Sequence, residues 1–276
     1  ALTRYAPPLP RATAALSAVL FGALLAGVAV FLWNADSAPL THNIAWFSVL
    51  LVGVWALGAL LQGRVSTSEL FMMVSAALSM ATAVVDWTEA HRIFKPLTML
   101  IALAVVARAP ALTGRAWLLA ALAGSLAGDV FLMFEGYFIP GLLAFLMAHL
   151  AYLGRLRLDA PWLASRPALW AVVTAALLAY AVLWVGGLPA DLRLPVAVYV
   201  GAIGCMAAQA VGRATVLRDP AACVVASGAV LFMASDALLA FNRFVAPLAA
   251  PDWWVLGFYG AAQCLLVMGL LRAGPR

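Results

Sequence analysis

Ten apolar tracts follow one another along this chain, at lengths suited to helices that cross a bilayer. They cover residues 12–33, 44–62, 69–86, 95–109, 115–134, 137–156, 167–187, 194–212, 221–241 and 252–272. Only 10% of the 276 residues are charged, whereas a soluble domain carries about 25%. No long polar tract remains for a separate soluble domain, and turn signals do not recur at strand spacing. The sequence therefore predicts an all-α, polytopic transmembrane bundle of about ten spans.

The basic residues divide unequally between the two sides of a ten-span threading. One side holds Arg4, Arg11, Arg64, Arg108, Arg115, Arg155, Arg157, Arg166, Arg213, Arg218, Arg272 and Arg276. The other side holds only Arg92, Lys95, Arg193 and Arg243. Because the loops of a membrane protein that are rich in Arg and Lys lie on the cytoplasmic side, we expect the first side, and with it both termini, in the cytoplasm. The net charge of +5 is spread over short loops, so nucleic acid is not an expected partner.

The fourth tract is the shortest and begins at Lys95-Pro96. Proline suits the first turn of a helix, because its missing N–H would lack an intrahelical partner there in any case. We therefore expect a short fourth span that starts at this dipeptide.

Two apolar tracts each contain one aspartate in a similar setting. Asp129 lies in Ala127-Gly-Asp129-Val-Phe-Leu-Met-Phe134, and Asp236 lies in Ala234-Ser-Asp236-Ala-Leu-Leu-Ala-Phe241. An ionisable side chain within a span costs about 2.5–3.5 kcal/mol on insertion scales, so it usually faces a bundle interior or a wet cavity. The two stretches are 107 residues apart, which suggests a parallel duplication of a four-helix unit, spans 3–6 and 7–10.

Each aspartate has a structural and a functional interpretation. In the structural one, it pairs with an arginine to hold the bundle together; in the functional one, both acids form one site. The preceding Gly128 and Ser235 are small, so a neighbouring helix or a ligand can approach. A close carboxylate pair in a low dielectric leaves one acid protonated and the other ionised, as general acid–base catalysis requires. The threading places both near the non-cytoplasmic face.

Other polar residues extend this candidate site. Arg92, Lys95 and Arg243 lie on the same side of the membrane as the acids, where each can bind a phosphate or extend to lipid headgroups. His149 and Tyr152 share one face of the sixth span, and Tyr259 and Gln263 share one face of the tenth. The remaining substrate-binding candidates are Tyr199 and Asn242.

No metal or nucleotide signature is present. The chain has no His-Glu-x-x-His, nucleophile elbow, P-loop or dinucleotide fingerprint. Cys205, Cys223 and Cys264 lie inside apolar tracts without metal-ligand spacing, which favours a packing role. We expect neither a metal ion nor an organic cofactor.

Four short motifs occur in order between residues 95 and 244. They are Lys95-Pro96-Leu-Thr-Met-Leu, Gly128-Asp129-Val-Phe-Leu-Met, Ala144-Phe-Leu-Met-Ala-His149-Leu-Ala-Tyr152 and Leu231-Phe-Met-Ala-Ser235-Asp236-Ala-Leu-Leu-Ala-Phe-Asn242-Arg243-Phe244. With Tyr259 and Gln263 in the last span, this ordered set resembles the YhhN family of integral-membrane lysoplasmalogenases. The resemblance covers about residues 69–272 and implies an eight-span catalytic core, which we place at residues 63–276. Residues 1–62 then form an N-terminal arm and two additional spans.

The resemblance also implies a reaction and its residues. Asp129 and Asp236 match the family's aspartate pair, Lys95-Pro96 its Lys-Pro and His149 its histidine. The implied enzyme hydrolyses the vinyl-ether bond of lysoplasmalogens to a fatty aldehyde and a glycerophospho-headgroup. Its partners are a lysophospholipid in the bilayer and water, with no obligate protein partner. A protonated acid opens a vinyl ether, and a second carboxylate can stabilise the cation and activate water.

Two other classes of function fit the same residues. A transporter or flippase for a lipid or small anion would use the aspartates as a proton relay. A structural membrane subunit would use them only to pair with arginines. We expect the hydrolase, in the inner (cytoplasmic) membrane of a bacterium, with its site nearer the non-cytoplasmic face.

Overall fold

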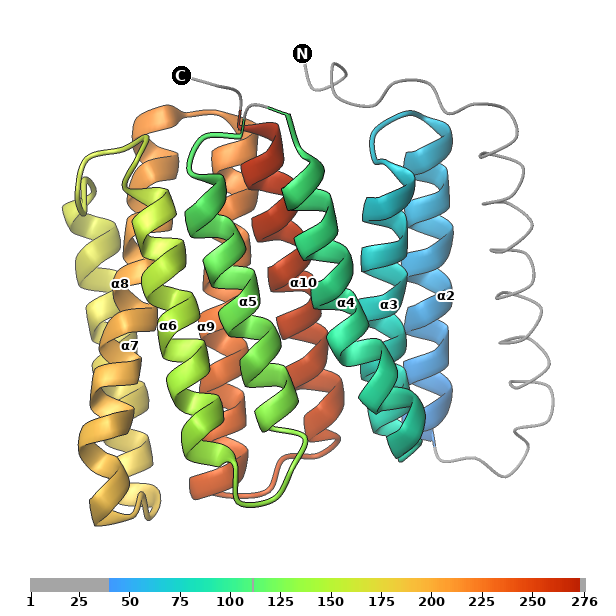
Figure 1. Cartoon of the computed structure of the whole chain (residues 1–276). Coiled ribbons are helices and arrows are strands. Elements are labelled where there is room, and N and C mark those ends of the chain that lie inside the picture. The colour runs from blue at the N-terminus through green and yellow to red at the C-terminus, as the bar shows by residue number, and fades with distance from the viewer. Residues whose placement is uncertain (1–39, 111, 274–276) are drawn as a thin grey trace. The chain divides into compact units, whose positions relative to one another are not determined.

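The computed structural model describes residues 40–110 and 112–273, and every regular element in them is helical (Figure 1). In chain order these are α2 (Leu40–Leu61), α3 (Thr67–Val84), α4 (Thr88–Arg108), α5 (Arg115–Phe131), α6 (Phe138–Leu156), α7 (Arg166–Gly186), the 3-10 turn η1 (Ala190–Leu192), α8 (Arg193–Leu217), α9 (Pro220–Phe244) and α10 (Pro251–Arg272). The expected span at 12–33 lies outside the described residues, so the count of ten spans stays a prediction.

The described helices have the lengths of membrane spans. Eight are long and apolar enough to cross a bilayer, and the exception is the 17-residue α5. With the low charge of the chain, this makes the protein an integral membrane protein of the all-α class, as predicted.

Helix α4 differs from the short span expected to begin at Lys95-Pro96. It begins at Thr88 and contains Pro96 in its interior. Hydropathy missed the first two turns because they carry Glu89, Arg92 and Lys95 among their polar residues. Since Pro96 lacks an N–H, it cannot bond to the Arg92 carbonyl one turn earlier, and the helix continues despite this missing bond.

Local signals explain where several helices begin. Ser66 and Glu69 form a capping box at α3, in which the Glu69 N–H donates to Ser66 Oγ and the Ser66 N–H donates to Glu69 Oε2. Asp219 accepts from the Ala222 N–H at the start of α9, and Pro220 occupies the first helical turn.

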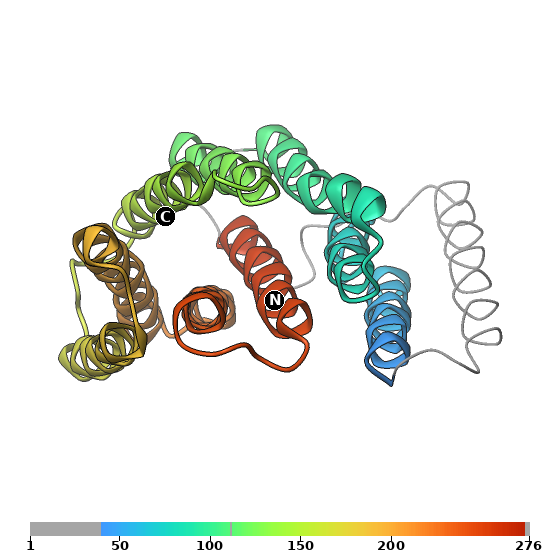
Figure 2. The same ribbon diagram turned by 90° about the horizontal axis from the view of Figure 1, so that it is seen from below.

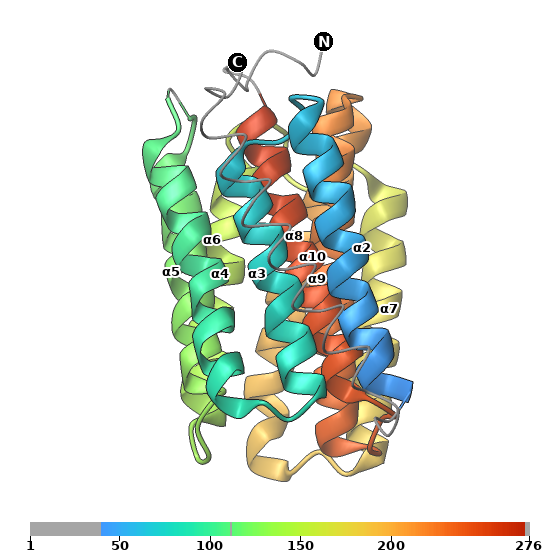
Figure 3. The same cartoon turned by 90° about the vertical axis from the view of Figure 1, so that its right-hand side faces the viewer.

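The described chain divides into two compact units, with the boundary between residues 101 and 102 of α4. In the first unit, α2 and α3 run side by side (Figure 3). The Thr98 hydroxyl donates to Ser75 Oγ at 3.0 Å, and His91 Nδ1 lies 2.9 Å from the Ser79 carbonyl oxygen. These bonds fasten the first part of α4 to α3. The expected domain boundary after residue 62 stays a prediction.

The second unit contains two tightly packed helix pairs, α5 with α6 and α9 with α10 (Figure 2). A glycine permits close approach in each pair. A Cβ at Gly124 would lie 3.0 Å from the Ala144 carbonyl oxygen, and one at Gly228 would lie 3.0 Å from the Ala262 carbonyl oxygen. Helix α8 packs against α6, α7 and α9. Each aspartate-bearing helix is therefore the first member of such a pair, while the predicted duplication itself stays a hypothesis.

Candidate functional site

The two aspartates lie toward the same end of the second unit, where the α5–α6 and α9–α10 connections run (Figure 1). Asp129 is two residues before the end of α5, and Asp236 is eight residues before the end of α9. As expected, the small residues before them allow close packing. A Cβ at Gly128 would lie 2.5 Å from the Phe145 ring, and the Ser235 hydroxyl donates to the Val255 carbonyl oxygen at 2.8 Å.

Asp129 is enclosed by a hydrogen-bonded cluster from three helices. Its side chain is buried, and its Oδ2 accepts from the Tyr259 hydroxyl on α10 at 2.7 Å. One turn along α10, Gln263 Oε1 accepts from the Tyr152 hydroxyl at 2.6 Å, and Gln263 Nε2 donates to Ser125 Oγ at 3.0 Å. The cluster therefore ties α5, α6 and α10 together through buried polar groups.

Asp236 has different neighbours. Its Oδ2 accepts from the Tyr199 hydroxyl on α8. His149 Nε2, on α6, lies 3.0 Å from the Tyr199 hydroxyl oxygen and 3.4 Å from Asp236 Oδ2. His149 is fully buried, whereas 15% of the Asp236 side chain is exposed. This exposure matters because it makes Asp236 accessible to a small molecule.

Aromatic rings join the two aspartate clusters. The Phe232 ring centroid lies 4.7 Å from that of His149 and 5.4 Å from that of Tyr259, with the rings edge to face in both pairs. Phe145 packs on both Phe232 and Tyr259, at 6.1 and 5.8 Å. The side chains near Asp129 and those near Asp236 are thus coupled by packing.

A cavity of about 450 Å³ opens beside Asp236. Residues of α6, α7, α8 and α9 and Leu132, just after α5, line it. Its polar lining residues are Asp236 and Tyr199, and all others are apolar. Asp129 is not a lining residue. Ligand pockets have this character, a mainly apolar volume of about 300–1,000 Å³ with a few placed polar groups.

Arg243 stands at the rim of this cavity. Its guanidinium carbon lies 4.1 Å from the centroid of Phe138 and 5.7 Å from that of Phe244, and both rings line the cavity. The side chain is exposed at the end of α9. A cation held by aromatic faces keeps its N–H donors available for an anion.

The remaining candidates lie elsewhere. Asn242 Oδ1 accepts from the Leu248 N–H at 2.8 Å, so it caps the loop after α9. Arg92 is exposed and donates to Glu89 at 3.4 Å. Arg92 and Lys95 belong to the first unit, so their part in a site with the aspartates stays a prediction.

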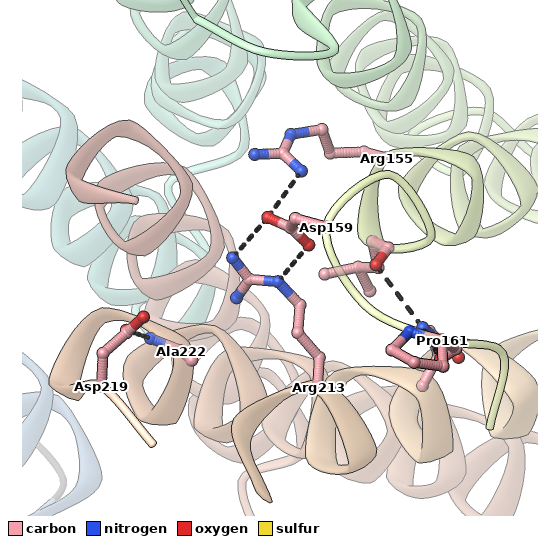
Figure 4. Close-up of polar contacts among 8 residues, drawn as sticks. Arg155, Asp159, Pro161, Arg213, Asp219 and Ala222 are labelled. Carbon is pink, nitrogen blue, oxygen red and sulfur yellow. Dashed lines mark hydrogen bonds and ion pairs between the residues drawn. The ribbon is translucent and has the colours of Figure 1, made fainter. Parts of the chain in front are cut away.

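A third carboxylate with little exposure, Asp159, lies at the opposite end of the second unit and was not predicted. Arg213 Nε and Nη2 donate to the two Asp159 oxygens at 2.6 and 2.8 Å, and Arg155 Nη1 donates to Asp159 Oδ2 at 3.2 Å (Figure 4). Burial acts to raise the pKa of Asp159, but the hydrogen bonds and charges of the two arginines outweigh it and hold this pKa below its usual value. The sequence signal was Arg213, a charge that directly follows the apolar tract 194–212 and lies four residues after Gln209.

Comparison with known proteins matches this chain to one family. The model of the YhhN family matches residues 90–270. A lysoplasmalogenase of Mycobacterium bovis is 36% identical over 183 residues, which are 63% of this chain and 67% of the relative. Human lysoplasmalogenase TMEM86B is 31% identical over 153 residues, which are 55% of this chain and 62% of the relative. No solved structure matches the chain.

Proposed function

Because the chain belongs to the YhhN family, we propose that it is a membrane lysoplasmalogenase, a hydrolase that acts on the vinyl-ether bond of lysoplasmalogens. The products are a fatty aldehyde and a glycerophospho-headgroup. The proposal extends to this chain what the names of its relatives state for them.

The observation that carries this proposal is the carboxyl group in the wall of an apolar cavity. The cavity accepts a hydrocarbon chain without leaving a buried polar group unpaired, because Asp236 and Tyr199 are its polar lining residues. A lysoplasmalogen has the matching form, an alkenyl chain with its reactive double bond next to a polar headgroup. The chain would lie in the cavity, and the double bond beside Asp236.

The chemistry of a vinyl ether suits this arrangement. Such a bond resists base and opens when a proton adds to carbon, which gives an oxocarbenium ion. A carboxylic acid held at that carbon can supply the proton, and proton transfer by a positioned group contributes about 10²–10⁴-fold in rate. The carboxylate left behind stabilises the cation, as carboxylates do in glycoside hydrolysis.

Arg243 is the proposed contact for the phosphate. It follows Asp236 by seven residues on one helix, so the rise along the axis between them is about 10 Å. A glycerophosphate headgroup that leaves the cavity past Phe138 and Phe244 would meet the guanidinium there. Lys95 and Arg92 remain predicted phosphate contacts in the first unit.

Aldehyde release from defined lipids tests this function. We expect the purified protein in detergent to release aldehyde from a 1-alkenyl lysophospholipid, and to leave the 1-alkyl ether and the 1-acyl ester intact. Asp236→Asn should abolish release, whereas Asp252→Asn, at an exposed residue in the first turn of α10, should not. A folded wild-type protein that releases no aldehyde, or that cleaves the ester, would contradict the proposal.

A further inference from the structure

We propose that one carboxyl group, Asp236, carries out the whole proton chemistry, and that Asp129 is a positioning residue. This inference rests on the proposed function and changes the mechanism expected from the sequence, in which the two aspartates share the acid and base roles. It starts from a difference in access, since Asp236 lines the cavity and Asp129 does not.

The hydrogen bonds around Asp236 assign a task to each of its oxygens. Tyr199 has one hydroxyl proton and donates it to Asp236 Oδ2. The Tyr199 oxygen can then only accept from His149 Nε2, 3.0 Å away, which places the histidine proton on Nε2. His149 Nδ1 is buried and finds no hydrogen-bond partner among the described residues, so a proton there would be unsatisfied.

Asp236 Oδ1 is the oxygen left for the substrate. It forms no hydrogen bond within the described part of the chain, while Oδ2 is held by Tyr199 and approached by His149 Nε2 at 3.4 Å. Because Asp236 lines the cavity and its Oδ2 is held by Tyr199, we assign the transferred proton to Oδ1. When that proton leaves, the Tyr199 O–H, whose oxygen accepts from His149 Nε2, stabilises the carboxylate that forms, which is where such a donor helps most.

One carboxyl group suffices for the balanced reaction. Oδ1–H adds its proton to the alkenyl carbon farther from oxygen, and the carboxylate faces the oxocarbenium ion. Water attacks the cation and gives one proton back to Oδ1, which leaves a hemiacetal. The same carboxyl then protonates the ether oxygen and takes the hydroxyl proton, so that the C–O bond breaks. One water is consumed, and Asp236 returns to its first state.

Asp129 acts on this site through packing. It holds the Tyr259 hydroxyl at 2.7 Å, and the Tyr259 ring lies against Phe232, which lies against the His149 ring. Losing the carboxylate charge would leave these rings in place. The titratable groups that face Asp236 are His149 and Tyr199, whereas the lining residues on α7 are apolar.

Two matched pairs of variants test the inference on the full-length protein. Each pair compares the same substitution at the two aspartates, Asp236→Asn with Asp129→Asn, or at their tyrosines, Tyr199→Phe with Tyr259→Phe. Aldehyde release is measured against pH with a 1-alkenyl lysophospholipid, and thermal unfolding is the check on folding.

We expect Asp236→Asn to lose about 10²–10⁴-fold and Asp129→Asn to stay within about tenfold, because only the first removes the proton-transfer group. Tyr199→Phe should lose about 10- to 100-fold, as expected for one hydrogen bond to a charged group. Tyr259→Phe keeps its ring and should remain active, whereas Tyr259→Ala should lose activity. The pH profile of Asp129→Asn should keep the wild-type midpoints.

The inference is overturned if the wild type is active and folded Asp129→Asn is as inactive as Asp236→Asn, or loses one limb of its pH profile. If Asp129→Asn does not fold, Tyr259→Phe decides, since it removes the hydroxyl that donates to Asp129 and keeps the ring that packs on Phe232. A wild type that releases no aldehyde would instead contradict the proposed function.

Discussion

Asp159 and Asp236 are both largely buried carboxylates in the second unit, yet their partners differ in kind. Asp159 is held by two arginines through hydrogen bonds of 2.6, 2.8 and 3.2 Å. Asp236 is held by a tyrosine hydroxyl and lies near one histidine nitrogen. Two fixed positive charges keep Asp159 ionised, whereas Asp236 has no such charge beside it among the described residues and accepts from Tyr199, whose oxygen lies 3.0 Å from His149 Nε2. The comparison indicates that a carboxylate that holds helices together needs fixed positive charges beside it, whereas the proton donor proposed at Asp236 needs neutral hydrogen-bonding neighbours.

The largest expected effect is on stability, at Asp159. Asp159→Asn leaves Arg155 and Arg213 buried without a counter-charge, and breaking a buried ion pair in this way costs about 3–5 kcal/mol. Denaturant unfolding in detergent should show this loss. Asp236→Asn should leave the unfolding transition near that of the wild type.

A triple variant provides the control. Arg155→Met, Asp159→Leu and Arg213→Met together remove every charge of the network, and apolar replacement of a buried ion network is often neutral or stabilising. Recovery of stability in the triple variant is the expected result. If the triple variant were as unstable as Asp159→Asn, the loss of stability could not be due to the uncompensated arginine charges.

The next effect concerns substrate binding at Arg243, an exposed cation paired with rings. Arg243→Gln should raise KM by about 10- to 100-fold with kcat little changed, the scale of one charge-assisted hydrogen bond. Arg193→Gln is the matched control, since Arg193 stacks on Trp184 at 3.9 Å and has no proposed part in binding. If both variants raised KM equally, the proposed contact between Arg243 and the phosphate would be contradicted.

The cavity wall should set the preferred chain length. Ala179 lines the cavity from α7, so Ala179→Phe should fill part of it and shift the preference toward shorter alkenyl chains by about tenfold, the scale of small size changes in apolar pockets. Leu178 is the neighbouring residue and is 63% exposed, so Leu178→Phe should leave the chain-length preference unchanged. A series of chain lengths assayed with both variants distinguishes these outcomes.

The smallest expected effect is on the pH dependence of stability. Because the pKa of folded Asp159 lies below its usual value, its stabilisation is fully present above the unfolded pKa of about 3.9 and is lost as the pH falls through the folded value. The loss is about 1.4 kcal/mol for each unit of difference. Unfolding measured from pH 7 to pH 3 should show this decline, and Asp159→Asn should lack it. An identical decline in both proteins would point to other carboxylates.

The helices themselves were largely predictable. Apolar tracts such as 137–156 and 252–272 agree with α6 and α10 within a residue at each end, because a membrane-spanning helix must satisfy its own backbone and be apolar over most of its length. Helix α4 was predicted too short because its first two turns lie among charged residues. Hydropathy registers only the part of a helix that is apolar.

The pairing of side chains was not predictable to the same degree. Tyr199, Tyr259 and His149 were identified as polar residues within spans, but which aspartate each contacts depends on how helices far apart in sequence pack. Asp159 was not identified because it lies in the loop between the apolar tracts 137–156 and 167–187, where a charge has no sequence feature that distinguishes it from an exposed one. The cavity beside Asp236 has no sequence signal, since it results from the spacing of α6, α7, α8 and α9.

Hydrolysis in D₂O tests the central claim most directly, namely that the cavity-lining carboxyl group of Asp236 opens the lipid by protonating carbon. The aldehyde is reduced to the alcohol as it forms, which prevents later exchange, and its deuterium content is read by mass spectrometry. The account predicts slower turnover and one deuterium on the carbon next to the former carbonyl, with neither product nor label in Asp236→Asn. Product without deuterium at that carbon would contradict it.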